Sequence, residues 1–264
     1  MLKTQKVGNI SITAKLKNQT SSPLQLRGQT ALSAVPKLYV EEFTGTWCPY
    51  CPRAIHMVDE ASKNPQVIAV AFHTGANSKG NPRYDPFSSS ATLIVGNVLG
   101  VRGYPSLVAN RDRNQHIQAY GNPVGITSRI PSDTSVGIAI QTTLSGHHLS
   151  ATVNVRSSET REAAHWVAII TEDKLIADQR NGTGRYPHIG KNFSHDHVYR
   201  KSYGDVRDGT EFSLPKDQTQ HLTFSLNLDN KLVPSNCKLV ILVMDKDRKV
   251  LNAQVVKLGD SISY

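Results

Sequence analysis

The sequence is poor in cysteine, with three in 264 residues. Two of them, Cys48 and Cys51, form a single CxxC motif, and the third, Cys237, lies far downstream. A small domain stabilised by several disulfides contains more cysteines, usually an even number. The count therefore argues against a disulfide scaffold and is typical of a catalytic cysteine pair.

Long apolar runs are also missing. No stretch approaches the roughly 18 apolar residues of a membrane span, and the segment from Met1 to Lys6 lacks the apolar core of a signal peptide. As given, the chain is therefore expected to be water-soluble. Any export signal or lipid anchor would precede this sequence.

Basic residues are numerous but scattered. Lys and Arg number 30 against 21 for Asp and Glu, which gives a formal charge of +9, yet no run of five or more basic residues occurs. The arm or stripe expected of a nucleic-acid binder is absent. We therefore predict no nucleic-acid partner, and the excess charge favours acidic partners or anionic surfaces.

The length exceeds the roughly 100 to 200 residues of a usual single domain, so two domains are expected. Residues 1–34 are predicted to be a β segment or linker, because residues 7–17 alternate apolar and polar side chains. An α/β domain is predicted at 35–131 and an all-β, immunoglobulin-like sandwich at 132–264. No internal repeat is seen.

The α/β domain is predicted from a change of hydrophobic period. Strand patterns occur at 38–43, 67–72 and 104–108, and helical patterns at 48–61 and 91–99, with a long loop over 73–90. The first strand, first helix and second strand form a βαβ unit, and the CxxC lies where that strand passes into that helix.

The second half has a different residue pattern. Short β-branched segments separated by turn residues indicate an antiparallel sandwich, at 136–144, 149–155, 165–170, 221–228 and 238–244. The loop over 178–194, which contains Gly, Arg and His, is expected to be only lightly ordered.

The CxxC predicts thiol-disulfide chemistry. At a helix N-terminus, free N–H groups and the positive end of the dipole would stabilise a Cys48 thiolate, the form that attacks disulfides. Cys51, one turn later, would then act as the resolving thiol. Trp47 offers a flat apolar surface for a polypeptide substrate, and Pro52 is expected to kink the helix.

Two segments, Phe43–Cys51 and Leu99–Leu107, resemble the two signatures of thioredoxin. The resemblance implies a thioredoxin-like fold in which Pro105 is cis and faces the CxxC, and in which the backbone of Tyr104 pairs with the substrate. It also implies proton transfer by Glu42, although thioredoxin has Asp where this sequence has Glu.

More narrowly, Val40–Cys48, Cys51–Ala54 and Phe193–Arg200, together with the β-rich half, resemble the family named after a twenty-eight-kilodalton bacterial outer-membrane protein. This resemblance covers roughly residues 37–264. It implies an exported protein of Bacteroides-like bacteria, in the periplasm or at the outer membrane or cell surface, held there by a lipid anchor that this sequence lacks.

Other interpretations of these residues stay open. A zinc site would need two further ligands beside the CxxC, and His195 with His197 would need a third, so we predict no metal and no cofactor. His56 is expected on a solvated helix face. Cys237 is expected to be a small buried hydrophobe or, if exposed, to pair two chains.

Two functions follow from the sequence. The first is an exported oxidoreductase or isomerase that uses Cys48 and Cys51 on protein thiols and disulfides, with Trp47, Tyr104 and Pro105 at the substrate. The alternative is an outer-membrane-associated binding or structural protein that has a thioredoxin-like scaffold and no turnover.

Overall fold

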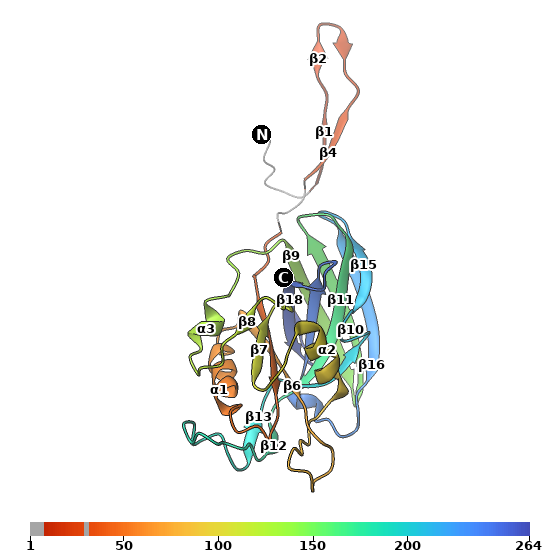
Figure 1. The fold of residues 1–264 in the computed structure, drawn as a ribbon. Helices are drawn as coiled ribbons and strands as arrows, with labels where there is room; N and C mark the ends of the chain where they lie inside the picture. The colour runs from red at the N-terminus through yellow and green to blue at the C-terminus, as the bar shows by residue number, and fades with distance from the viewer. Residues whose placement is uncertain (1–7, 29–31) are drawn as a thin grey trace.

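The computed structural model describes residues 8–28 and 32–264 (Figure 1). Most of its regular structure is β. The helices are α1 (Pro52–Ala61), α2 (Ser90–Leu99), α3 (Val124–Thr127) and the 3-10 turn η1 (Pro234–Asn236). The N-terminal strands form a separate antiparallel hairpin, in which β1 (Gly8–Ile12) pairs with β4 (Leu24–Gly28), and β2 (Lys15–Leu16) pairs with β3 (Gln19–Thr20). Of the N-terminal segment predicted over residues 1–34, residues 1–7 and 29–31 lie outside the described residues.

The α/β part contains the predicted elements. Strand β5 (Leu38–Thr44) is parallel to β6 (Val67–His73) and antiparallel to β7 (Ser106–Ala109), which pairs with β8 (His116–Ile117). The spatial order is therefore β6-β5-β7-β8. Side chains alternate along β5, so that Leu38 and Val40 pack against α1 while Tyr39 and Phe43 pack on the side of α2. The two helices cover opposite faces, as Figure 1 shows.

The same sheet continues into the second half of the chain. Strand β14 (Val198–Tyr203) pairs in parallel with β6 through Val198 and Ala71, and further strands extend the sheet in the order β18-β17-β11-β14. These strands are β11 (Arg161–Glu172), β17 (Cys237–Met244) and β18 (Val250–Lys257), with β15 (Thr210–Leu214) paired to β11. One large sheet thus crosses the boundary predicted at residue 131, and the domain limits stay predictions.

A small sheet packs on the outer part of the large one. It has the order β16-β10-β9-β19, formed by β9 (Val136–Ser145), β10 (His148–Ser157), β16 (Thr219–Asn227) and β19 (Ser261–Ile262). Alternate side chains of β9 and β10 meet those of β11 and β17 in a continuous apolar core around Trp166. This confirms the two β layers expected from the short strand patterns. An immunoglobulin-like strand order stays a prediction.

The large sheet also curls back on itself. Val167 and Ile169 of β11 share one buried apolar cluster with Phe43 and Phe72 of the α/β part. Helix α2 packs against the same cluster. Asn252 of β18 ties the layers together, because its amide binds backbone groups from both halves. The turn that follows β5 is therefore held on a framework built by the whole chain.

Candidate dithiol site

Cys48 and Cys51 form a disulfide in the turn between β5 and α1, with their Cα atoms 5.4 Å apart. The N–H of Cys48 donates to the carbonyl of Gly45 at 3.0 Å, and Cys51 is the N-cap of α1. The prediction that the helix includes Cys48 is wrong: α1 begins at Pro52. The predicted kink is wrong for the same reason, because a proline at the first helical position removes no hydrogen bond.

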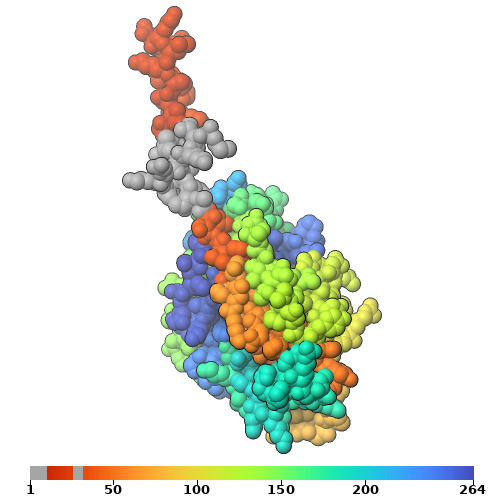
Figure 2. Space-filling model, turned by 90° about the vertical axis from the view of Figure 1, so that its left-hand side faces the viewer, coloured from red at the N-terminus to blue at the C-terminus, as the bar shows by residue number. Residues whose placement is uncertain are grey.

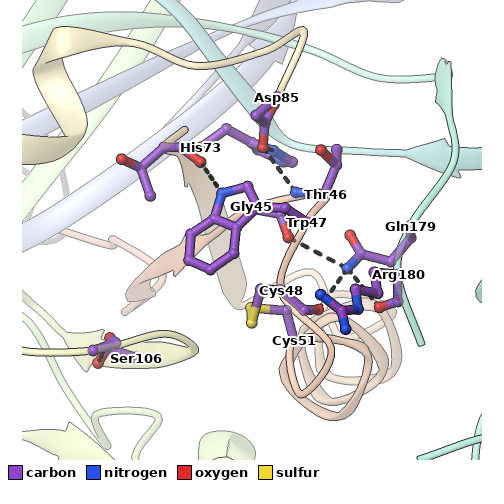
Figure 3. Close-up of a disulfide and its surroundings, with 12 residues drawn as sticks. Gly45, Thr46, Trp47, Cys48, Cys51, His73, Asp85, Ser106, Gln179 and Arg180 are labelled. Carbon is purple, nitrogen blue, oxygen red and sulfur yellow. Dashed lines mark hydrogen bonds and ion pairs between the residues drawn. A yellow bond between two sulfur atoms is a disulfide. The ribbon is translucent and has the colours of Figure 1, made fainter. Parts of the chain in front are cut away.

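Aromatic side chains flank this turn. The indole N–H of Trp47 donates to the carbonyl of Thr74 at 2.7 Å, and the ring meets that of Tyr104 edge-on, 5.9 Å between centroids. The Tyr104–Pro105 bond is cis. In Figure 3 the disulfide faces the chain at Ser106, the residue that follows Pro105. The fold therefore brings Trp47, which directly precedes Cys48, into contact with Tyr104 of the cis Tyr104–Pro105 pair.

A buried carboxylate anchors the approach to the turn. Asp85 accepts hydrogen bonds from the backbone N–H groups of Thr46 and Phe87, each at 2.8 Å, and lies 2.9 Å from Nδ1 of His73. Burial alone would raise the pKa of Asp85, but the bond and charge of His73, with the two N–H groups, hold it below its usual range. Asp85 carries no signal in the sequence because it lies in an irregular loop.

His195 lies beside this ion pair. Its ring is buried and packs edge-on against His73, Phe87 and Phe193. Burial, with His73 nearby, lowers the pKa of His195 to about 3. Strand β13 ends at His195, so His197 does not share a strand face with it. Within residues 8–28 and 32–264, no group of three or more His, Cys, Asp or Glu side chains is arranged to hold a metal ion.

Glu41 and Glu42 point to opposite faces of β5 and differ in partners. Glu41 binds the guanidinium of Arg111 at 2.9 Å and the hydroxyl of Tyr39 at 3.1 Å. Glu42 lies on the α1 face, is 3% exposed, and its Oε1 has no hydrogen-bond partner among the described residues. Burial, together with the charge of Asp59 on α1, raises the pKa of Glu42 to about 8.

A segment from the second half of the chain binds the dithiol turn. We call residues 178–192 the strap; they connect β12 (Leu175–Ala177) to β13 (Phe193–His195). Within it, the side-chain amide of Gln179 donates to the carbonyl of Cys48 at 3.0 Å and of Gly45 at 3.3 Å. Backbone N–H groups of the strap also donate to the turn, from Arg180 to Thr46 at 2.7 Å and from Gly182 to Pro49 at 2.9 Å.

The strap also packs on helix α1. Ile55 of the helix forms a small apolar cluster with Tyr186 and Ile189 of the strap, and His56 stacks on Tyr186, 4.6 Å between centroids. Figure 2 shows the strap, in teal, against this part of the molecule. The expectation of a lightly ordered loop is therefore wrong, and His56 is partly covered. Neither contact is visible in the sequence, since the partners lie more than 100 residues apart.

Cys237 takes no part in the site. Its side chain is buried at the start of β17, and burial raises the pKa of its thiol to about 12. A thiol that stays protonated is a poor nucleophile. The expectation of a small buried hydrophobe is confirmed.

The fold and site define a mostly β protein whose disulfide-closed CxxC turn is supported by its own second half. The profile of the family described as outer membrane protein Omp28 matches residues 94–262. The chain belongs to this family. Accordingly, it is a protein of the periplasm or of the outer membrane and cell surface. The matched region leaves out Cys48 and Cys51, so the family gives location and not a reaction.

Two solved structures, the first two of the three that follow, share the fold. HBP35 of Porphyromonas gingivalis is similar over 86% of this chain and 76% of its own, with 17% identity and a TM-score of 0.69. A structural-genomics protein of Agrobacterium tumefaciens covers 89% of this chain and 99% of its own, with 16% identity and a TM-score of 0.55. A domain of the outer membrane lipoprotein Omp28 of P. gingivalis covers 49% of this chain and 91% of its own, with 15% identity and a TM-score of 0.33. Comparison with curated proteins gives no match.

In the part of the chain that the structure describes, no helix is both long and apolar enough to span a membrane.

Proposed function

We propose that this protein exchanges thiols and disulfides with protein substrates through Cys48 and Cys51, on a thioredoxin-like unit formed by β5 to β8. The observation that carries the proposal is the contact of Trp47 with Tyr104 of a cis Tyr104–Pro105 pair, directly beside a CxxC disulfide that precedes α1. The strand order β6-β5-β7-β8 with helices on both faces supports it. A pair of cysteines needed only for stability would not require this surrounding.

The reaction follows from the order of the two cysteines. In the reduced protein, the Cys48 thiolate attacks one sulfur of a substrate disulfide, a mixed disulfide forms, and the other substrate sulfur leaves as a thiolate. Cys51 then loses its proton and attacks the Cys48 sulfur. The second substrate thiol is released, and the Cys48–Cys51 disulfide of the present structure is formed. Two electrons pass to the substrate, and the reverse sequence oxidises a substrate dithiol.

The charges around the turn favour both the Cys48 thiolate and the proton transfer from Cys51. Cys48 lies shortly before the N-terminus of α1, where the positive end of the helix dipole stabilises a negative charge. Glu42 lies on the α1 face of β5, and a pKa of about 8 suits an acid that must take up and return a proton near neutral pH. In this proposal Glu42 accepts the proton of Cys51.

Trapping tests the proposal. The Cys51→Ser variant, reduced and mixed with an oxidised protein substrate, is expected to accumulate a mixed disulfide through Cys48, because the resolving thiol is absent. Mass spectrometry of a non-reduced digest identifies the linked peptides. The Cys48→Ser variant is the matched control and should form far less adduct. Equal adduct from both variants, or none from either, would contradict the proposal.

A second function is favoured by one observation. Cys48 and Cys51 are only 1% and 0% exposed, so the sulfurs meet little solvent in the oxidised form. A binding or structural protein of the outer membrane would keep such a disulfide unreacted. Alkylation of the reduced protein with iodoacetamide separates the two functions: fast labelling of Cys48 supports exchange, whereas protection of both thiols supports a structural disulfide.

A further inference from the structure

An open groove of about 560 Å³ lies next to the dithiol turn. Thr46 and Trp47 form its inner end. One wall is the loop after β6, at Asn81–Pro86, and the other wall is the strap, at Asp178–Arg180 with Lys191. Trp47 directly precedes Cys48 in the chain. A polypeptide whose cysteine reaches Cys48 therefore meets this groove within a few residues.

The groove is positively charged. Arg180 and Lys191 line the strap wall with exposed side chains, and the guanidinium of Arg83 lies 4.1 Å from the centre of the Trp47 ring. Within the described residues, none of these three cations forms an ion pair. Asp178 is the one acidic side chain of the lining among the described residues, and it accepts the backbone N–H of Asn192 at 2.9 Å.

The walls of the groove are fixed. The hydroxyl of Thr46 donates to the carbonyl of Tyr84 at 3.0 Å, which ties the inner end to the loop wall. The N–H of Arg180 donates to the carbonyl of Thr46, which ties the same residue to the strap wall. Figure 3 shows Thr46 between Asp85 and the strap. A site whose walls are already fixed loses less conformational entropy when it binds a ligand.

We propose that this groove binds an acidic segment of the substrate polypeptide, next to the cysteine that reacts with Cys48. The inference rests on the proposed function and names its substrate class. Arg180 and Lys191 are exposed on the strap wall, and exposed Arg83 lies over Trp47 at the inner end of the groove. Exposed cations spaced in this way suit several carboxylates along an extended chain rather than one small anion held by convergent buried donors. A concave groove also fits a chain better than a flat lipid surface.

The test compares three short peptides that carry one cysteine as a mixed disulfide with thionitrobenzoate. Their flanking residues are Asp and Glu, Asn and Gln, or Lys. Reduced protein attacks the mixed disulfide and releases the coloured thiolate, which gives the rate. At low salt we expect the acidic peptide to react about tenfold faster than the neutral one, since charge in a cleft raises association rates. Added salt should remove the advantage.

Two charge-reversal variants complete the design. The double variant Arg180→Glu with Lys191→Glu should lose the preference for the acidic peptide and react faster with the Lys peptide. The matched control is Lys216→Glu with Lys257→Glu, which makes the same charge change at exposed positions outside the groove and should keep the preference. Alkylation of Cys48 by neutral iodoacetamide at equal rates shows that the turn is intact in both.

The outcomes are distinguishable. Exchange at equal rates for the acidic and neutral peptides overturns this inference and leaves the proposed function standing. Preference that persists in the groove variant also overturns it. The wild-type protein could show no peptide preference but bind anionic phospholipid vesicles, and the groove variant could lose that binding. This result would overturn the inference and show that the cations of the groove contact a membrane surface. If none of the peptides reacts and the thiols of the reduced protein cannot be alkylated, the proposed function itself is overturned.

Discussion

The side-chain amide of Gln179 donates a hydrogen bond of 3.0 Å to the backbone carbonyl of Cys48, 131 positions earlier in the chain. The donor belongs to the second half of the molecule and the acceptor to the CxxC turn. Gln179 is buried, and the same amide also reaches the carbonyl of Gly45. The β-rich half therefore helps to set the shape of the dithiol turn.

Removing this side chain tests the link. The Gln179→Ala variant removes one hydrogen bond from each of the Cys48 and Gly45 carbonyls, which keep their backbone N–H donors, so the free energy of unfolding of the oxidised protein should fall by about 0.5 to 1.5 kcal/mol. Urea denaturation measures the change. Gln118→Ala, at an exposed position, is the control and should stay near the wild-type value. Equal midpoints for the two variants would show that the contact does not stabilise the turn.

Glu42 makes the stability depend on pH in a defined direction. Its pKa is raised from 4.5 to about 8, so between these values the folded protein keeps a proton that the unfolded chain has lost. The free energy of unfolding should therefore decrease as pH rises from about 4.5 to 8, by at most about 1.4 kcal/mol per pH unit.

The Glu42→Gln variant removes the carboxyl group that binds this proton. Its stability relative to the wild-type protein should grow as pH rises through that window and level off above pH 8. Urea denaturation of both oxidised proteins at several pH values gives the comparison. A difference between them that does not change with pH would contradict the pKa and the proton-transfer role built on it.

The sequence predicted the βαβ unit and the strands of the second half because their hydrophobic periods are regular. It could not predict that β14 joins β6, since that pairing connects residues far apart in the chain. At the site, the CxxC and the segment around Pro105 were visible as local motifs. Gln179 and Asp85 were missed because they lie in irregular loops and reach the turn through hydrogen bonds between residues far apart in the chain.

The buried pair of Glu41 and Arg111 offers a separate test of the framework beneath the site. Breaking it by Arg111→Met leaves a buried carboxylate without its cation and should lower the free energy of unfolding by about 3 to 5 kcal/mol. The double variant Arg111→Met with Glu41→Gln should recover a large part of this loss, because no charge is then left unpaired. Urea denaturation of the single and double variants measures the coupling, and simple additivity of the two losses would contradict it.

The central claim is that Cys48 and Cys51 exchange disulfides with proteins. Reduction of insulin, followed by the turbidity of its released chains in the presence of dithiothreitol, tests it most directly. The wild-type protein should shorten the lag well below that of dithiothreitol alone, and Cys48→Ser should abolish the effect while Cys237→Ser preserves it. Equal lag times with wild-type protein, with Cys48→Ser and without protein would contradict the account.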